Sequence, residues 1–343
     1  MPLTTFHPHK NIDKFGRFLI IGCGSIGKRH LRNLRQLGIK DLAAFDVRQD
    51  RLDEIQKEFD IPVFNDLESA LCYDVRVALI CTPTSLHIPP ALAAARKGCH
   101  LFIEKPLSHS LESVDELIEE VMQHNLLTLV GCNFRFHPGL QYIKNLIENE
   151  KIGRVMYAGA KFGQYLPDWH PWEDYRHGYS AQRSLGGGVI LDRVHEIDYL
   201  RWLFGEVKEL YCSADHVSNL EIDTEDVAEI IMHFSGGMVA SAHLDYISRR
   251  YMCELEVLGE AGSIYWSYQD SKVAVYLASD QTWHSVIWEK YDPNSMYLEE
   301  MQHFINVLAG LEESQQDVEQ ASRVLRIALA AKQSAITGSK VAL

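Results

Sequence analysis

The chain has 343 residues, 46% of them hydrophobic and 23% charged, which is usual for a globular protein of about two domains. Its formal net charge of −14 argues against a nucleic-acid partner and against an anionic membrane surface. No apolar run reaches the roughly 18 residues of a membrane span. The seven cysteines form no Cys-x-x-Cys pair, so we expect reduced thiols and neither a disulfide framework nor a metal site.

The N-terminal stretch from Met1 to Gly16 is polar and contains His and Pro. It lacks the apolar core of a signal peptide, so we expect a cytoplasmic protein with a short disordered or docking arm at this end.

An apolar run, Phe18–Ile21, leads directly into a glycine-rich turn and then into a helical stretch, Lys28–Leu37. A Gly-x-Gly-x-x-Gly turn between a strand and a helix is typical of dinucleotide binding. Its glycines allow a tight turn, the approach of a pyrophosphate and close packing of the helix, whose N-terminus holds the anion. The turn residues that we expect to bind the cofactor are Gly22, Gly24, Ser25, Ile26 and Gly27.

A second strand, Asp41–Phe45, ends at Asp46, about 20 residues beyond the glycine turn, where an acid bonds the adenosine ribose hydroxyls. Asp46 favours NAD over NADP, because a 2′-phosphate would meet a carboxylate. Arg48 leaves two possibilities open: it is either an exposed surface charge or a partner for that phosphate. NAD is therefore the expected cofactor, with NADP as the alternative.

Helical and apolar extended segments alternate up to Gly131, which predicts an α/β domain with a doubly wound parallel sheet over residues 15–131. The helical segments are Arg51–Phe59, Asp66–Cys72, Pro89–Lys97 and Leu111–His124. The extended segments are Pro62–Phe64, Val75–Cys81, His100–Ile103 and Leu127–Val130. This Rossmann-type domain is predicted to bind the dinucleotide.

Ligands of such sheets bind beyond the carboxyl ends of the strands. We therefore expect the residues that follow two of the strands to border the cofactor: Thr82, Pro83 and His87 after one strand, and Glu104 and Lys105 after the other. His87 would alternatively be structural and cap the following helix. Lys105 would alternatively be a solvated loop lysine.

The pattern changes after Gly131, and residues 132–343 are predicted to form an α+β domain with a mostly antiparallel open sheet. The predicted strands are Val155–Tyr165, Val207–Val217, Thr224–Phe234, Met238–Ile247, Met252–Gly259, Gly262–Tyr268 and Val273–Leu277, and the predicted helices are Gly139–Glu148, Ser295–Leu308 and Asp317–Thr337. The sequence Ser235-Gly236-Gly237 indicates a hairpin. We expect this domain to bind the substrate and to provide an oligomer interface.

Three glycines, Gly186–Gly188, precede a helix that ends at Gly205. This helix carries apolar side chains on almost all of its surface, so it is predicted to be buried. Its ionisable groups then need either bonding partners or a functional role. Asp192 and His195 are three residues apart and therefore adjacent on one helix surface, with Tyr199 close by. A carboxylate beside an imidazole suits proton transfer, although a buried pair that only satisfies itself is the open alternative.

The loop Tyr165–Arg183 combines aromatic residues with His and Arg, a mixture that stacks on sugar rings and pairs with anionic groups. Such long loops are usually functional, although a packed Ω-loop at an oligomer contact is the alternative. The residues that we expect to shape the substrate pocket, besides Asp192 and His195, are Arg135, His137, Trp172, Tyr175, Arg176 and Arg183.

Together these motifs resemble the Gfo/Idh/MocA oxidoreductase family, named for glucose–fructose oxidoreductase and inositol dehydrogenase, from about Phe15 to Leu343. The motifs that match are Gly22–Gly27 with Asp46, Thr82-Pro83 with His87, Glu104-Lys105-Pro106, Asn133 to Pro138, and Gly186–Gly188 with Asp192 and His195. The resemblance implies a homodimer or homotetramer formed through the open sheet. It also implies that Lys105, Asp192 and His195 are the catalytic set.

One spacing departs from the family pattern. Many members place the Asp four residues before the His, whereas here the spacing is three. Asp192 would then orient His195 differently or contact the substrate instead. The Trp-His-Pro-Trp loop resembles that of members associated with nucleotide-activated or acidic sugars.

The predicted function is NAD(P)-dependent hydride transfer between the nicotinamide and a secondary hydroxyl or keto carbon of a sugar, cyclitol or nucleotide-activated sugar. His195 would be the proton acceptor, Asp192 would orient it, and Lys105 would bond the same oxygen and the nicotinamide ribose. Two alternatives are an epimerase or lyase that recycles bound NAD, and a non-catalytic regulator that senses NAD(H). The retained catalytic set argues against the regulator.

Overall fold

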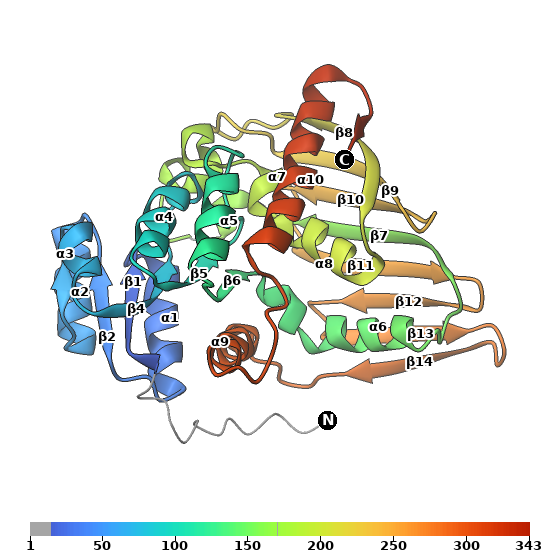
Figure 1. Cartoon of the computed structure of the whole chain (residues 1–343). Coiled ribbons are helices and arrows are strands. Elements are labelled where there is room, and N and C mark those ends of the chain that lie inside the picture. Colours follow the sequence, from blue (N-terminus) through green and yellow to red (C-terminus); the bar gives the residue numbers. More distant parts are fainter. Residues whose placement is uncertain (1–14, 170) are drawn as a thin grey trace. The chain divides into compact units, whose positions relative to one another are not determined.

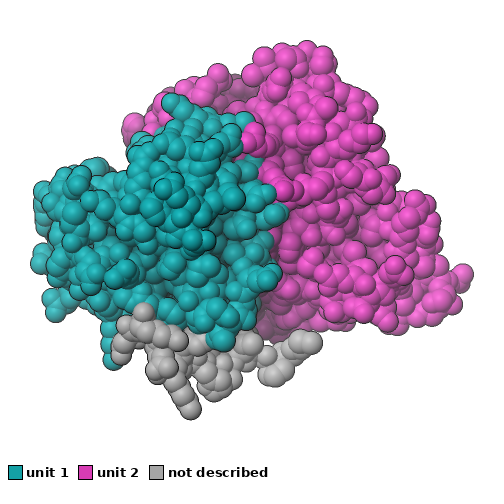
Figure 2. Space-filling view, in the orientation of Figure 1, with its two compact units in different colours: residues 1–132, 293–322 teal, residues 133–292, 323–343 magenta. Residues whose placement is uncertain are grey.

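The computed structural model describes residues 15–169 and 171–343, so most of the expected N-terminal arm lies outside the described residues. The chain divides into two compact units (Figure 2), Met1–Cys132 with Pro293–Ser322 and Asn133–Asp292 with Arg323–Leu343. The division expected from the sequence assigned Pro293–Ser322 to the second domain, whereas this segment packs with the first unit. Within the described ranges, no helix is both long and apolar enough to cross a membrane.

The first unit is built on a six-stranded sheet in the order β3-β2-β1-β4-β5-β6, with all neighbouring strands parallel (Figure 1). Its strands are β1 (Arg17–Ile21), β2 (Leu42–Phe45), β3 (Val63–Phe64), β4 (Val75–Ile80), β5 (His100–Glu104) and β6 (Thr128–Gly131). Its helices are α1 (Ser25–Gln36), α2 (Gln49–Phe59), α3 (Leu67–Leu71), α4 (Ile88–Arg96), α5 (Val114–Gln123) and α9 (Asn294–Leu308). This is the doubly wound order, which reverses between β1 and β4, and it confirms the predicted fold class.

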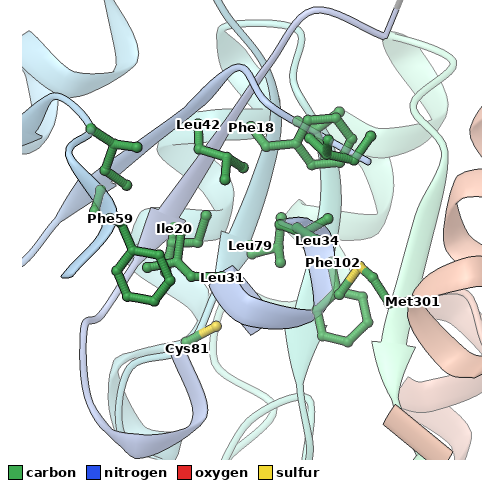
Figure 3. Close-up of a cluster of buried hydrophobic side chains, with 14 of the residues drawn as sticks. Phe18, Ile20, Leu31, Leu34, Leu42, Phe59, Leu79, Cys81, Phe102 and Met301 are labelled. Carbon is green, nitrogen blue, oxygen red and sulfur yellow. The ribbon is translucent and has the colours of Figure 1, made fainter. Parts of the chain in front are cut away.

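The hydrophobic core of the first unit lies between the sheet and its helices (Figure 3). Ile20 of β1 and Leu34 of α1 are fully buried in it, because central parallel strands are covered on both faces. Met301 of α9 belongs to the same core, and the Phe304 ring lies 5.7 Å from the Phe102 ring. These contacts explain why α9, far along the sequence, packs with the first unit.

The second unit is built on a nine-stranded sheet in the order β14-β13-β12-β11-β7-β10-β9-β8-β15 (Figure 1). Its strands are β7 (Val155–Gly163), β8 (Val207–Asp215), β9 (Val227–Phe234), β10 (Val239–Asp245), β11 (Met252–Gly259), β12 (Gly262–Ser267), β13 (Lys272–Leu277), β14 (Thr282–Ile287) and β15 (Val341–Ala342). Among the described strands of this sheet, only β7 and β10 pair in parallel, which confirms the predicted mostly antiparallel sheet. The sequence pattern did not identify β14, whose residues are all exposed, or the two-residue β15.

Helices of the second unit cover one face of this sheet (Figure 1). They are α6 (Pro138–Glu148), α7 (Val189–Asp192), α8 (Val194–Phe204) and α10 (Val318–Thr337), whose first residues belong to the other unit. Alternate residues of β9, such as Ile230 and Met232, are fully buried, while Ile231 between them is exposed. The hairpin expected at Ser235-Gly236-Gly237 joins β9 to β10, with Phe234 N donating to Met238 O at 3.0 Å.

Candidate functional site

The glycine motif forms the turn between β1 and α1. Gly22 has φ +100°, in the left-handed region that favours glycine. A Cβ added to Gly27 would lie 2.0 Å from the carbonyl oxygen of Gly22, so only glycine lets the helix approach the strand this closely. A Cβ added to Gly24 would meet only the Arg51 Nη1 atom, at 4.0 Å. The motif residues that begin α1 are Ser25 and Ile26.

The start of α1 therefore has the features that a pyrophosphate requires. Its first turn carries no acidic residue, and the side of the turn at Gly24 is open. The amide N–H groups of a helix N-terminus stabilise an anion placed there. The residues present fit a dinucleotide.

Asp46 lies directly beyond β2 and is buried. Its Oδ2 atom accepts a hydrogen bond from Cys23 N at 2.8 Å, and its Oδ1 atom accepts one from Arg48 N at 2.9 Å. These bonds fix the carboxylate beside the glycine turn, where it fits the ribose hydroxyls. The Arg48 guanidinium pairs with Asp50 at the surface, while Arg51 Nη1 lies 3.4 Å from Asp46 Oδ2.

His87 joins the loops that follow two neighbouring strands. Its Nε2 atom lies 2.9 Å from Thr82 O, and its Nδ1 atom lies 2.9 Å from Pro106 O. Pro83 lies between these loop residues and precedes a 3₁₀ turn, Thr84–Leu86. His87 is the N-cap residue of α4, but its side chain makes no capping hydrogen bond to that helix. Burial lowers the pKa of His87.

Glu104 is the last residue of β5, and Lys105 follows it at the carboxyl end of that strand. Glu104 Oε1 lies 2.6 Å from His30 Nε2, and Glu104 Oε2 accepts a hydrogen bond from Lys105 N at 3.2 Å. Burial raises the pKa of Glu104, but the hydrogen bond to His30 and the nearby positive charges of His30, Lys105 and His87 together hold that pKa below its usual value. Glu104 thus fixes the backbone of Lys105, whose side chain is half-buried.

In the second unit, the glycines before α7 allow a loop to pack against them. A Cβ on Gly187 would lie 2.2 Å from Tyr179 O and 2.6 Å from Ser180 O. Gly188 has φ +105°, and its Cβ would overlap the Glu225 carboxylate at 2.3 Å. The glycine triplet therefore brings residues 179–182 against the start of α7.

Asp192 is only 1% exposed, and three hydroxyl groups converge on its carboxylate. Oδ2 accepts hydrogen bonds from Ser180 Oγ at 2.7 Å and from the Tyr246 hydroxyl at 3.0 Å. Oδ1 accepts one from the Tyr179 hydroxyl. Asp192 therefore links the loop before the glycines to the end of β10.

The helix expected from Val189 to Phe204 is not continuous, so the prediction of one helix surface for Asp192 and His195 is wrong. Arg193, with φ −99° and ψ 36°, separates α7 from α8. Its guanidinium carbon lies 3.5 Å from the centre of the Phe162 ring, and its Nη2 donates to Glu196 Oε1 at 3.0 Å. These two contacts hold the Arg193 side chain at the point where the helix is interrupted. The prediction that the segment is buried is confirmed.

His195 lies in the first turn of α8 and is 5% exposed. Its imidazole packs against the Phe134 ring, with centroids 4.7 Å apart and planes inclined by 36°. Tyr199 follows one turn later and is fully buried. The unit thus holds a buried imidazole in a fixed packing environment.

Two residues expected in the substrate pocket have partners inside the second unit. The Arg135 guanidinium donates to Asp198 from Nε at 2.8 Å and from Nη2 at 2.7 Å, and both side chains are buried. His137 Nδ1 accepts a hydrogen bond from Gly139 N at 3.0 Å and caps α6, and burial lowers its pKa to about 3. Both side chains are therefore engaged within the second unit, and their place in a substrate pocket stays a prediction.

The other expected pocket residues lie on the loop Tyr165–Arg183. Arg176 forms a bidentate ion pair with Asp174 and a longer one with Glu221, whose N–H donates to the Tyr175 hydroxyl at 3.2 Å. The Trp172 side chain is 75% exposed. These side chains lie on the outer part of the loop.

Arg183 is bonded to a neighbouring turn: its N–H donates to Asp223 Oδ1 at 2.6 Å, and its Nη2 donates to Asp223 O at 3.0 Å. The residues that the structure brings to Asp192 and His195 were not identified from the sequence as site residues. They are Phe134, Tyr179, Ser180 and Tyr246. The motif Asn133 to Pro138 was a signal for Phe134, whereas no local pattern marks Tyr246.

Two family models match the chain. One, described as an oxidoreductase family with an NAD-binding Rossmann fold, matches residues 16–132, and the other, described as the GFO/IDH/MocA C-terminal domain, matches residues 140–265. The chain belongs to the Gfo/Idh/MocA oxidoreductase family. The predicted NAD-binding Rossmann domain and oxidoreductase class are thereby confirmed.

Named relatives in this family include enzymes of two kinds. The chain is 29% identical over 334 residues to the myo-inositol 2-dehydrogenase of Thermotoga maritima, covering 93% of this chain and 96% of the relative. It is 28% identical over 232 residues to the 2,7-anhydro-N-acetylneuraminate hydratase of Mediterraneibacter gnavus, and this match covers 65% of this chain and 59% of the relative.

A solved structure of levoglucosan dehydrogenase, in complex with NADH and levoglucosan, has the same fold. It superposes with a TM-score of 0.86 at 23% identity, covering 95% of this chain and 98% of that one.

Proposed function

We propose that this family member is an NAD-dependent dehydrogenase or reductase that acts on a secondary hydroxyl or keto carbon of a sugar, a cyclitol or a nucleotide-activated sugar. The observation that carries the proposal is His195, a buried imidazole three residues after the buried carboxylate of Asp192. The glycine turn with Asp46 fits the cofactor, and the named relatives include a myo-inositol 2-dehydrogenase and a 2,7-anhydro-N-acetylneuraminate hydratase.

His195 is the proposed proton acceptor. In the oxidation it removes the hydroxyl proton of the substrate, and in the reduction it returns that proton to the oxygen. Imidazole suits this task because its ordinary pKa lies near neutral pH. The carboxylate of Asp192 accepts hydrogen bonds from three hydroxyl groups. We propose that these bonds hold residues 179 and 180 against α7 and so fix the backbone that leads to His195.

Lys105 is the proposed donor to the substrate oxygen that loses or gains the proton. Its ammonium group stabilises the negative charge that develops on that oxygen. Glu104 holds the Lys105 backbone, and His87 holds the carbonyl of Pro106 that follows. Bound NAD supplies the hydride acceptor, and NADP is the alternative cofactor.

The exposed loop residues Trp172, Tyr175, Arg176 and Arg183 are proposed to contact the outer part of the substrate. The first unit is proposed to hold the cofactor, and the second to bind the substrate and to form a homodimer or homotetramer. We also propose that the protein works in the cytoplasm.

A second candidate function is a net non-redox reaction in which bound NAD is recycled. It is favoured by the relative named as a hydratase. In that case His195 and Lys105 perform the same proton transfers, but no reduced cofactor accumulates.

The test incubates the purified protein with NAD or NADP and a panel of cyclitols, free sugars, anhydro-sugars, uronic acids and nucleotide sugars, while the absorbance of reduced nicotinamide is followed. We expect turnover with one substrate class and NAD. His195→Asn should lower turnover by about 10²- to 10⁴-fold. The matched control is His124→Asn, which lies at the exposed C-terminal end of α5, outside the proposed substrate loop, and should retain full turnover.

Product formation without net reduced nicotinamide would favour the recycled-cofactor reaction. Full turnover of His195→Asn would refute the role of His195 in either reaction.

A further inference from the structure

Phe134 belongs to a 3₁₀ turn, Asn133–Phe136, that is attached rigidly to α8. The next residue, Arg135, forms the buried bidentate ion pair with Asp198 on α8. The carbonyl of Phe134 accepts a hydrogen bond from His137 N at 3.0 Å, where α6 begins. The turn therefore cannot shift along α8 without breaking a buried ion pair.

His195 lies on the same helix as Asp198, one turn earlier. Because Asp198 fixes the turn and His195 shares its helix, the separation between the Phe134 ring and the imidazole is set by backbone structure. The two rings lie 4.7 Å apart with an angle of 36° between their planes, which is contact distance for aromatic rings.

The Phe134 ring is in turn held by other aromatic residues of the second unit. Tyr268 is stacked on it at 5.8 Å, Tyr199 at 6.5 Å, and Trp266 meets it edge-on at 6.3 Å. Phe134 itself is only 7% exposed. A ring enclosed in this way has little freedom to rotate or tilt.

Phe134 has no polar atom, so it can neither move a proton nor bond a substrate oxygen. It can act only through the side chains that it touches. A proton-transfer imidazole must hold its plane within about 10–20° of the productive direction, and packing is the means by which proteins hold such groups.

We propose that Phe134 is a positioning residue that sets the orientation of the His195 imidazole for proton transfer. The inference rests on the proposed function of His195. Loss of the ring frees the imidazole plane while its helix stays in place, so the proton transfer slows and substrate affinity is retained.

The test compares Phe134→Leu with a matched control, Phe234→Leu. Phe234 is a buried ring of β9 in the same unit that packs edge-on against Phe204 at 6.2 Å. Both variants lose a buried ring, so both should show a lower melting temperature. Only Phe134→Leu should lose kcat, by about 10- to 100-fold at nearly constant KM, with a displaced pH–rate profile. Phe134→Tyr keeps the ring and should recover most of the turnover.

A second readout requires no substrate. The Cε1–H resonance of His195, assigned by its loss in His195→Asn, should lie in the ring current of Phe134. In Phe134→Leu this resonance should move and titrate at a different pH, while in Phe234→Leu it should stay unchanged.

The outcomes separate this inference from the proposed function. If His195→Asn keeps full turnover, the proposed function fails, and with it the inference. If His195→Asn is inactive but Phe134→Leu keeps both kcat and the resonance, only the inference is overturned. Equal losses of kcat in the two leucine variants would also overturn it, because they would reflect packing alone.

Discussion

Replacing Asp192 by asparagine tests how the carboxylate organises the second unit. Oδ2 accepts two hydroxyl hydrogen bonds, from Ser180 and Tyr246, while Oδ1 accepts one, from Tyr179. The single carbonyl oxygen of asparagine is expected to take the position with two donors. Its NH₂ group then faces the Tyr179 hydroxyl, which loses its acceptor.

The magnitude follows from the bond that is lost. A hydrogen bond to a charged group contributes about 1.5–3 kcal/mol, and the remaining two bonds lose their charge assistance. We expect the free energy of unfolding to fall by about 2–3 kcal/mol, which corresponds to a decrease in melting temperature of about 4–12 °C. The effect should be greatest near residue 179, so hydrogen exchange should increase in residues 175–183.

The assay combines thermal unfolding with hydrogen-exchange mass spectrometry. The matched control is Asp226→Asn in the same unit, because Asp226 is also fully buried and accepts bonds from Val217 N and from Ser218 N and Oγ. The control should be destabilised by a similar amount while residues 175–183 keep their protection. An Asp192→Asn protein with the melting temperature and the loop protection of the parent would refute the reasoning.

Three further predictions concern other parts of the chain. Gly27→Ala places a Cβ where only 2.0 Å is available and should abolish the fluorescence change on NADH binding, with about 1–3 kcal/mol lost in stability. Arg135→Ala breaks a buried ion pair and should cost about 3–5 kcal/mol in urea unfolding, whereas Arg176→Ala at the surface should leave the unfolding midpoint nearly unchanged. The hydrogen bond from His243 to Asp245 raises the pKa of His243 above its ordinary 6.5, so its stabilisation is complete below pH 6.5 and is lost as the pH rises through the raised value. A His243→Gln protein should show a flatter dependence of melting temperature on pH there.

Much of the first unit could be predicted because its signals are local. A strand, a glycine turn and a helix follow one another directly, and the steric requirement at Gly27 operates between residues a few positions apart. Because both faces of β1 and β4 are buried, these strands are nearly continuous apolar runs. Such runs can be recognised in the sequence without knowing which strands lie beside them. The sequence also predicted the central strands of the second sheet, and in β9 buried residues do alternate with more exposed ones.

The sequence did not indicate where α9 packs. Its apolar face shows that it is covered, but only the tertiary structure selects Phe102 and the α1 helix as its partners. The strand β14 was missed because every residue in it is exposed, so burial imposes no alternation. Its pairing with β13 comes from backbone hydrogen bonds, which the side-chain pattern does not encode.

The sequence by itself determined which candidate groups the chain carries: the glycine turn with Asp46, Lys105 after β5, and Asp192 three residues before His195. Their surroundings were decided by the tertiary structure. The break at Arg193, the Tyr246 hydroxyl on Asp192 and the Phe134 ring on His195 each join segments that only the folded chain brings together. Local sequence specifies which groups a segment carries, but the partner that satisfies a buried charge or encloses a ring is selected by packing among distant segments.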